Sequence, residues 1–419
     1  MDYKNLIPSG ASYQLRTERK QTNNVKFDGN KFERFAAKDK TEQVARVLHD
    51  GKLGIASGSK PNSGEELIKT AAEMASYGSP HDVPFVGKAD IKPMNLASDQ
   101  TISAKEMADI AGSLVEDLQK LDSRISASAT LSSVIEEQNL KTSNGFDTNY
   151  RKTFWNLMGS IDLTVDGDRL GIYDWAASTA PTFDPKAMVN TIAQKLNWAK
   201  NTVPFKAGAY PVIFSPGEVY YTVLPIIQSL MGRAVYQKVS PLGDKLGQQL
   251  FDPCFTLVDD GTIDGQWTSK PFDSEGTPTR RNALVQNGVL GTFLADRKYA
   301  AHLGMEATGN ADGLNFVSID AGTKSFDEMI KSIDYGMLID GSMGAWSGNP
   351  YAGIVTGTIS MGLLIENGEI KGRVKDSMFT INAFEHLKNN IMDMSAERVM
   401  HGNCLFPYLQ LSDVVISTN

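Results

Sequence analysis

The sequence of 419 residues contains only two cysteines, Cys254 and Cys404. Two thiols are too few for a disulfide framework, which fits a reducing compartment. The most apolar stretch, Val219 to Ile227, is about half as long as a bilayer span must be. The N-terminal residues show neither an apolar core region nor an Arg-rich amphipathic pattern, so we expect no targeting segment. These absences predict a soluble, cytoplasmic protein without membrane contact.

Basic residues and histidines are also scarce. Lys and Arg number 41 against 49 Asp and Glu, a formal net charge of −8, which argues against nucleic acid as a partner. Of the five histidines the closest two are His386 and His401, too far apart for a His-Glu-x-x-His zinc signature. Phosphate-binding, dinucleotide-binding and Gly-x-Ser-x-Gly patterns are missing as well. Most common enzyme classes therefore lose their usual sequence support, and we expect no cofactor.

The residues that are present predict strands and helices of ordinary kinds. Apolar residues make up 41% and charged residues 21% of the chain, enough for a buried core in each domain. Asp28-Gly29 and Asp50-Gly51 stand between apolar runs and predict tight hairpins. Capping residues followed by apolar periods predict four helix starts. These starts are Ser63 with Glu66, Ser103 with Glu106, Asp184-Pro185, and Ser215-Pro216 with Glu218.

A domain boundary is expected near Asn201 to Tyr210, where Pro204 and Gly208 break the helical pattern. We therefore predict two domains, residues 1–205 and residues 206–419. Strands and helices mix without a regular alternation, which favours an α+β fold with mostly antiparallel sheets.

Acidic residues are one candidate for chemistry. Asp259, Asp260, Asp273 and Glu275 cluster in a turn-rich stretch. Paired carboxylates can do acid–base work or bind a cation, whereas Asx turns in solvated loops are the commoner use of such residues. Both interpretations stay open at this point.

Three other features suggest binding or structure. Arg280 and Arg281 are adjacent, so on a strand only one of them can clamp a carboxylate at a given site. The glycine-rich run from Gly341 to Gly362 would let an extended peptide add to a strand edge, or would form bulges and turns. His401 and Cys404 offer one nitrogen and one sulfur, which more often belong to a surface histidine and a buried thiol.

Several long segments carry a resemblance to a known family. They are FSPGEVYYTVLPIIQSL, LVDDGTIDGQW, PFDSEGTPTRRNALVQNGVLGTFLADRKYAAHLGMEATGNADG and GLLIENGEIKGRV. Together they resemble the TldD/PmbA family, once described as modulators of DNA gyrase, over nearly the whole chain. The resemblance implies an N-terminal α/β region, a C-terminal region rich in sheet, and a groove for extended or unfolded peptides.

The resemblance also implies a branch of the family. TldD-like chains carry His-Glu-x-x-x-His on the helix after the Pro-Gly turn and a cysteine near the C-terminus, which together bind a catalytic metal. PmbA-like chains, also called TldE, lack the histidines and pair with a TldD-like subunit in a cytosolic peptidase. Around Leu224, Pro225 and Ser229 no metal ligand remains here, and only Cys404 falls where a ligand is expected. The chain therefore resembles the PmbA branch.

These observations lead to one principal hypothesis and two alternatives. We expect a non-catalytic subunit of a TldD-type metallopeptidase heterodimer that helps to bind unfolded peptides, with a homodimer possible when it is isolated. The expected groove residues are Asp273, Glu275, Arg280, Asn310, Gly357 and Gly362. The first alternative is a stand-alone peptidase or hydrolase around the acidic cluster, His302 and Cys404. The second, which the net charge disfavours, is a DNA-binding protein or gyrase modulator.

Overall fold

The computed structural model describes residues 3–61, 63–165 and 167–418. It confirms the α+β class, with mostly antiparallel sheets. The contacts divide the chain into two compact units: residues 1–193, 261–280 and 296–313 form unit 1, and residues 194–260, 281–295 and 314–419 form unit 2. The expected single boundary after residue 205 would assign both short segments to the second domain. In the structure these segments interrupt unit 2 in sequence but pack with unit 1. No helix in the described part of the chain has the length and apolar character that crossing a membrane requires.

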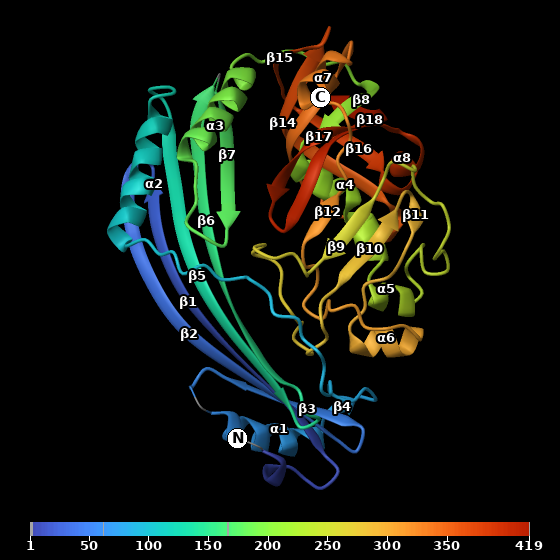
Figure 1. Cartoon of the computed structure of the whole chain (residues 1–419). Coiled ribbons are helices and arrows are strands. Elements are labelled where there is room, and N and C mark those ends of the chain that lie inside the picture. The colour runs from blue at the N-terminus through green and yellow to red at the C-terminus, as the bar shows by residue number, and fades with distance from the viewer. Residues whose placement is uncertain (1–2, 62, 166, 419) are drawn as a thin grey trace. The chain divides into compact units, whose positions relative to one another are not determined.

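Unit 1 is built on a seven-stranded antiparallel sheet in the order β4-β3-β2-β1-β5-β6-β7 (Figure 1). The predicted hairpins at Asp28-Gly29 and Asp50-Gly51 are confirmed, since they join β1 to β2 and β2 to β3. The strand bounds are β1 Ser12–Asp28, β2 Lys31–His49, β3 Lys52–Gly58, β4 Ser79–Pro80, β5 Ser126–Thr142, β6 Asp147–Val165 and β7 Asp168–Ser178.

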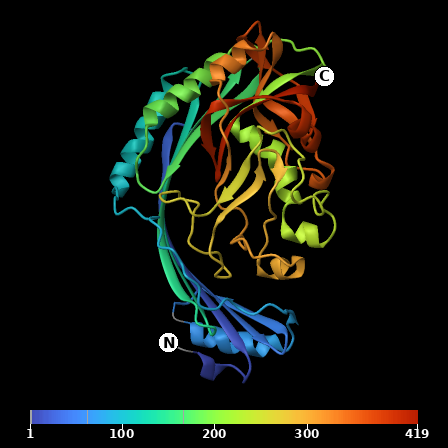
Figure 2. The ribbon, with the colours of Figure 1, turned by 45° about the vertical axis from the view of Figure 1, so that its right-hand side comes forward.

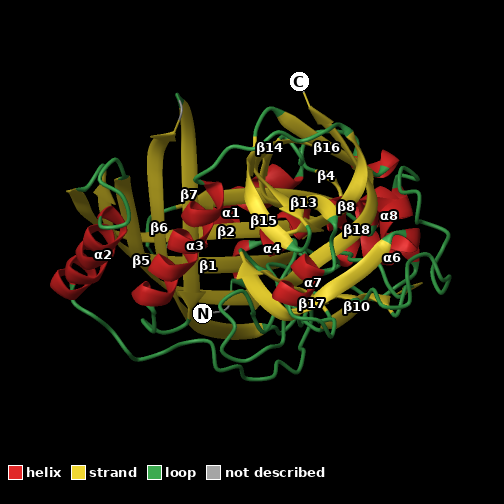
Figure 3. Ribbon diagram, turned by 90° about the horizontal axis from the view of Figure 1, so that it is seen from above, coloured by secondary structure: helices red, strands yellow, loops and turns green. Residues whose placement is uncertain are grey.

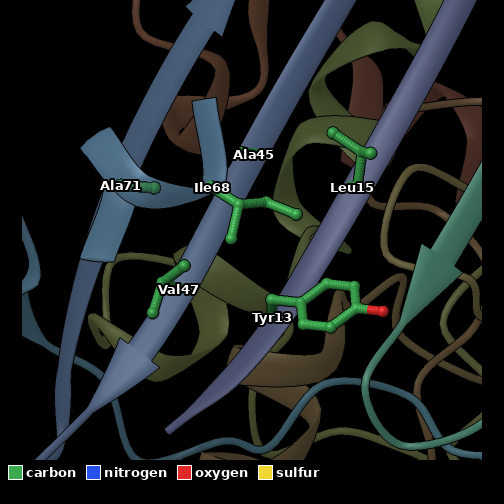
Figure 4. Close-up of a cluster of buried hydrophobic side chains, with 6 residues drawn as sticks. All are labelled: Tyr13, Leu15, Ala45, Val47, Ile68 and Ala71. Atoms are coloured by element: carbon green, nitrogen blue, oxygen red, sulfur yellow. The ribbon is translucent and has the colours of Figure 1, made fainter. Parts of the chain in front are cut away.

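Helix α1 (Gly64–Ala75) packs directly on one end of this sheet. A Cβ atom at Gly54 of β3 would meet the carbonyl oxygen of Ala71 at 2.0 Å, so only glycine allows this approach. Beneath the helix lies a buried apolar cluster of the sheet and α1 (Figure 4), which comprises Tyr13, Leu15, Ala45, Val47, Ile68 and Ala71. Farther along the strands, α2 (Ala104–Gln119) packs on β1, β5 and β6.

The helix starts show which capping signals act locally. Ser103 and Glu106 form the predicted capping box at α2. Asp184 accepts a hydrogen bond from the N–H of Ala187 in α3 (Pro185–Ala199), as the Asp-Pro start predicts. The predicted box of Ser63 with Glu66 is wrong, because the Ser63 hydroxyl donates to Gln43 and to a nearby carbonyl instead.

The two short segments of unit 1 carry turns and one helix, α6 (Arg297–Leu303). Phe272 of the first segment is fully buried against Phe146 and Tyr150, with ring centroids 5.3 Å and 5.2 Å apart. An aromatic anchor of this size explains why this segment packs with unit 1.

Unit 2 contains an eleven-stranded sheet, part of which closes on itself. The strands β8, β13, β14, β16 and β18 form a ring, because β18 pairs with β8 as well as with β16. Figure 2 shows β9 to β18 in yellow to red, and Figure 3 shows the strands from above. The strand bounds are β8 Gly208–Phe214, β9 Leu257–Asp260, β10 Arg281–Gln286, β11 Val289–Leu290, β12 Val317–Ile319, β13 Tyr335–Met343, β14 Ile354–Glu366, β15 Glu369–Val374, β16 Ser377–Asn382, β17 Ile391–His401 and β18 Cys404–Thr418.

The helices of unit 2 are short except for α4 (Pro216–Ser229), which follows β8 directly. The others are α5 Gly232–Tyr236, α7 Phe326–Lys331 and α8 Ala383–Asn389, and single 3-10 turns lie at Lys4–Leu6 in unit 1 and at Pro350–Ala352 in unit 2. α4 contacts β18, β13 and α8, and most of its residues are buried. A helix that is apolar on nearly every side belongs to an interior, which is where α4 lies.

Candidate functional site

The N-terminal turn of α4 holds a buried carboxyl group, Glu218. Its side chain is 5% exposed, and both carboxylate oxygens accept hydrogen bonds from Ser342 of β13. The Ser342 N–H donates at 2.9 Å to one oxygen, and the Ser342 hydroxyl donates at 2.5 Å to the other. Ser215 lies at the N-cap but makes no side-chain capping bond, so the predicted capping box with Glu218 is wrong.

Burial raises the pKa of Glu218 to about 7, and the two hydrogen bonds from Ser342 lower it only in part. The nearby carboxylate of Asp340 adds to the rise. A carboxyl group with a pKa near neutrality changes charge within the physiological range, a property that ordinary surface glutamates lack.

Three further polar side chains lie around this carboxyl group in unit 2. The Asp340 carboxylate forms an ion pair with the Lys195 ammonium, with 2.8 Å between the oxygen and the nitrogen. The His401 ring lies over Gly217, since a Cβ atom at Gly217 would meet the ring at 3.1 Å. Burial lowers the pKa of His401, and the positive charge of Lys195 lowers it further, whereas Asp340 opposes the change. At neutral pH the imidazole is therefore neutral.

Exposed aromatic and apolar side chains stand next to this cluster. The rings of Tyr221 in α4 and Trp346 have centroids 5.8 Å apart. Trp346 is 57% exposed and Met343, one residue after Ser342, is 59% exposed. We call Tyr221, Met343 and Trp346 the aromatic patch. Rings and thioethers of this kind bind apolar side chains with little demand on sequence.

The predicted groove residues Asp273 and Glu275 lie together in a turn of unit 1. Asp273 is fully buried, and its carboxylate accepts hydrogen bonds from the N–H groups of Glu275, Thr277 and Ala311 at 2.9–3.0 Å. Burial raises the pKa of Asp273 to about 6, and the hydrogen bonds from Ala311 and Thr277 oppose that rise. This carboxylate therefore ties two loops together, as the Asx-turn interpretation proposes.

The side chains of Glu275, Asn310 and Arg280 also hold neighbouring segments in place. Glu275 accepts a hydrogen bond from the N–H of Arg297 at 3.0 Å. Asn310 donates to the carbonyl of Gly313, while Arg280 pairs with Glu306 at 2.9 Å. The structure brings Glu275 and Asn310 close to Asp273 through shared turns. Their role in binding peptide stays a prediction.

Gly357 and Gly362 both lie in β14 but differ in their surroundings. Gly362 is paired on both sides, with Ile339 of β13 and Val374 of β15, so an added peptide strand finds no open edge there. Gly357 is paired with Phe379 of β16, and the pairing of β14 with β13 starts one residue later, at Thr358. Gly362 therefore offers no open edge for strand addition, whereas Gly357 lacks a β13 partner but is buried beside Ala345, and its role in binding peptide stays a prediction.

The comparisons with known proteins agree with this fold. The family model described as "PmbA/TldA metallopeptidase C-terminal domain" matches residues 207–418, which is half of the chain. The chain belongs to the PmbA/TldD family. It is 28% identical over 418 residues to an uncharacterised protein of Methanocaldococcus jannaschii, covering 93% of this chain and 94% of that protein.

Two further relatives carry names within the family. The metalloprotease PmbA of Escherichia coli is 24% identical over 373 residues, which are 85% of this chain and 80% of that protein. The crystal structure of TldE from Thermococcus kodakarensis superimposes with a TM-score of 0.89 at 25% identity, covering 99% of this chain and 98% of that one. The expected family is thereby confirmed.

A metallopeptidase family implies a bound metal, and the residues of this PmbA/TldD chain do not fit one. Among the described residues, no group of three or more His, Cys, Asp or Glu side chains is placed to hold a metal ion. Pro225 and Ser229 are buried in α4 and Leu224 is half-buried, and none of them is a zinc ligand. Burial raises the pKa of Cys404 to about 12, so without a metal this thiol stays protonated, and a single cysteine does not form a zinc site.

Other residues considered from the sequence also have structural partners. Asp259 is fully buried, and its carboxylate accepts hydrogen bonds from the N–H and the side-chain amide of Asn315 at 2.7 Å and 3.1 Å. His302 lies in the last turn of α6 in unit 1, whereas Asp259 and Cys404 lie in unit 2. The cluster proposed for a stand-alone hydrolase is therefore divided between the two units.

Sequence reasoning missed Glu218 and Ser342 as a pair. The spacing of Ser215 and Glu218 is that of a capping box, which assigns the carboxylate to the helix end. The signal that could have corrected this is the helix itself. VYYTVLPIIQ is apolar on nearly every side, which favours burial of the helix, and a buried carboxylate in its first turn needs a partner from another element.

Proposed function

We propose that this chain is the non-catalytic, PmbA/TldE-like subunit of a TldD-type metallopeptidase and helps to bind extended or unfolded peptides that the partner cleaves. The observation that carries the proposal is α4. It stands where the family's metal-binding helix is expected, with Leu224, Pro225 and Ser229 where the two histidines and the glutamate would be needed. A chain with the family's fold and no fitting donor set needs another subunit for hydrolysis.

The aromatic patch supports the part of the proposal that concerns peptides. Trp346, which lies beside Tyr221, and Met343 are both more than half exposed, and the start of β14 lies close to them in sequence. Unfolded peptides present apolar side chains and free main-chain groups together. The aromatic patch is suited to the apolar side chains of such peptides.

The decisive experiment measures metal and activity. The purified chain is analysed for zinc and incubated with an unfolded peptide, alone and with a family chain from the same organism that carries His-Glu-x-x-x-His. We expect less than one tenth of an equivalent of metal and no cleavage alone, and faster cleavage in the mixture than with the partner alone. One equivalent of zinc together with peptide cleavage by the isolated chain would refute the proposal.

A variant tests the contribution of the aromatic patch. Trp346→Ala should weaken binding of an unfolded peptide to the complex by roughly ten- to a hundredfold, because burying a large apolar side chain contributes on the order of 1.5–3 kcal/mol. Tyr236→Ala, at an aromatic residue of α5 that is 47% exposed, is the matched control and should bind as the unsubstituted chain does. An equal loss of peptide affinity in both variants would contradict a role of the aromatic patch in peptide binding.

A further inference from the structure

A small pocket in unit 1 lies where β1 meets the two short segments of the unit. Its volume is about 10 Å³. A cavity needs roughly 10–15 Å³ to hold one water molecule, so this pocket has room for an occupant of that size and not for a larger one. All the residues that line it belong to unit 1. Its polar side chains are those of Gln14, Arg46, His81, Glu275 and Arg297.

Gln14 brings to the pocket a hydrogen-bond acceptor that has no partner in the protein. Successive strand residues alternate faces, so Gln14 lies on the opposite face of β1 from Tyr13 and Leu15, which pack under α1. Gln14 is 3% exposed, and its amide nitrogen donates to the carbonyl of Ser274 at 2.9 Å. That bond fixes the orientation of the amide, because a flipped amide would place two acceptors against each other. Among the described residues, no group donates to the buried Gln14 Oε1.

Arg297 brings the matching donor. Its Nη2 donates to the carbonyl of Pro84 at 3.0 Å, and its main-chain N–H donates to the Glu275 carboxylate, also at 3.0 Å. The Nε–H of Arg297 is buried and has no acceptor in the described part of the chain. Leaving a buried donor or acceptor without a partner is costly, and ordered waters commonly satisfy such groups.

The charges around the pocket select a neutral occupant. The Arg46 guanidinium pairs with the Glu275 carboxylate, with 3.6 Å between the nitrogen and the oxygen. Burial lowers the pKa of His81, and the charge of Arg46 lowers it further against the effect of Glu275, so the imidazole is neutral at pH 7. Arg46, Arg297 and Glu275 together leave one positive charge, which repels a cation. An anion would face the Gln14 Oε1 and the Glu275 carboxylate, and it has no proton to donate to either oxygen.

We propose that this pocket binds one ordered water molecule, which accepts a hydrogen bond from the Arg297 Nε–H and donates one to the Gln14 Oε1. The water thereby joins β1 to the first residue of α6, beside the segment that carries Glu275. It is a part of the junction that holds the two short segments against the sheet of unit 1. The inference does not rest on the proposed function, which depends on α4 and on the aromatic patch.

The test compares the full chain with two variants that make the same chemical change. Arg297→Lys replaces the Nε–H by a methylene group and keeps the positive charge. Arg46→Lys makes this replacement at the second arginine of the pocket and is the matched control, because the Arg46 Nε does not belong to the buried atoms without a partner. In a high-resolution crystal structure of the unsubstituted chain, we expect one density peak at about 2.7–3.2 Å from both the Gln14 Oε1 and the Arg297 Nε. The peak should persist in Arg46→Lys and be lost in Arg297→Lys.

A solution measurement supports the crystallographic one. Magnetic relaxation dispersion of water oxygen-17 counts the water molecules that a protein holds for long times. We expect Arg297→Lys to hold one long-lived water fewer than the unsubstituted chain, and Arg46→Lys to hold the same number. Circular dichroism and the melting temperature verify that both variants are folded.

Each outcome bears on one part of the inference. The lack of a peak between the two atoms in the unsubstituted chain would overturn the site. Crystals grown with bromide in place of chloride test the occupant, since an anomalous bromide peak in the pocket would overturn its assignment to water. A peak of unchanged height in Arg297→Lys would overturn the role of the Nε–H. Zinc binding and peptide cleavage by the isolated chain would overturn the proposed function and leave this inference intact.

Discussion

The carboxyl group of Glu218 makes a prediction about the pH dependence of stability. Its pKa is raised from 4.5 to about 7 by burial in the folded chain. Between these two pH values the folded chain binds the proton that the unfolded chain has released. The free energy of unfolding therefore falls as the pH rises through this range. The stabilisation is complete below the unfolded pKa and is lost above about pH 7.

The size of the effect follows from the same two values. A pKa rise from 4.5 to about 7 corresponds to about 3 kcal/mol. Glu218→Gln removes the ionisation while keeping the shape. The amide oxygen can accept from the Ser342 N–H, and the amide nitrogen can donate to the Ser342 hydroxyl. We therefore expect the variant to match the unsubstituted chain near pH 4.5 and to exceed its stability by about 3 kcal/mol at pH 8.

The assay is calorimetric or urea-induced unfolding of both proteins between pH 4.5 and 8.5. The quantity compared is the difference between the two free energies of unfolding at each pH. Other titrating groups cancel in this difference, among them Asp273 with its pKa of about 6. A difference that stays constant across the range would refute the reasoning, because it would mean that Glu218 ionises in the folded chain as it does in water.

Three further predictions concern turns and thiols. Asp273→Ala should lower the free energy of unfolding by about 2–4 kcal/mol, because it leaves three buried N–H groups without their acceptor; a loss below about 1 kcal/mol in urea unfolding would contradict this. Gly276→Ala should cost more than Gly51→Ala by thermal unfolding, since both have positive φ but only at Gly276 would a Cβ atom meet a side chain, at 2.5 Å; equal costs would contradict the clash. Cys404 should react with a thiol reagent at pH 7.5 only after unfolding, because it is buried and its pKa is raised to about 12. Cys254 is exposed, so it should react in the folded chain, but slowly, because its pKa is also raised to about 12. Mass spectrometry of the labelled chain locates the modification. Fast labelling of Cys404 in the folded chain would contradict the expectation that it is buried.

Local signals predicted much of the fold because they act between near neighbours. The two Asp-Gly hairpins and the Ser103 capping box depend on turn geometry and on bonds within four residues, and all are present. The same pattern failed at Ser63 and Ser215, where the serine or the glutamate has a better partner elsewhere. Gln43 lies 20 residues from Ser63, and Ser342 lies 124 residues from Glu218.

The candidate site was harder to predict because its contacts join residues that lie far apart in the sequence. The pairing of Glu218 with Ser342 and the position of His401 over Gly217 depend on how strands of a closed ring bring distant segments together. No spacing in the sequence records that closure. The acidic run around Asp273 was visible in the sequence, but its carboxylate is used by main-chain N–H groups, which composition cannot show.

The closed ring of unit 2 has a consequence for synthesis of the chain. β18 pairs with β8, β12, β16 and β17, and β8 is translated roughly 200 residues before it. At 5–20 residues per second this interval is on the order of 10–40 s. During that time the edge of β8 that pairs with β18 lacks this neighbour, and the edges of β12 and β16 lack it from their later synthesis on, so the nascent chain is exposed to aggregation until Cys404–Thr418 emerges. The ring of unit 2 therefore closes only after β18 has been made, and a fragment that ends before β18 should remain dependent on chaperones.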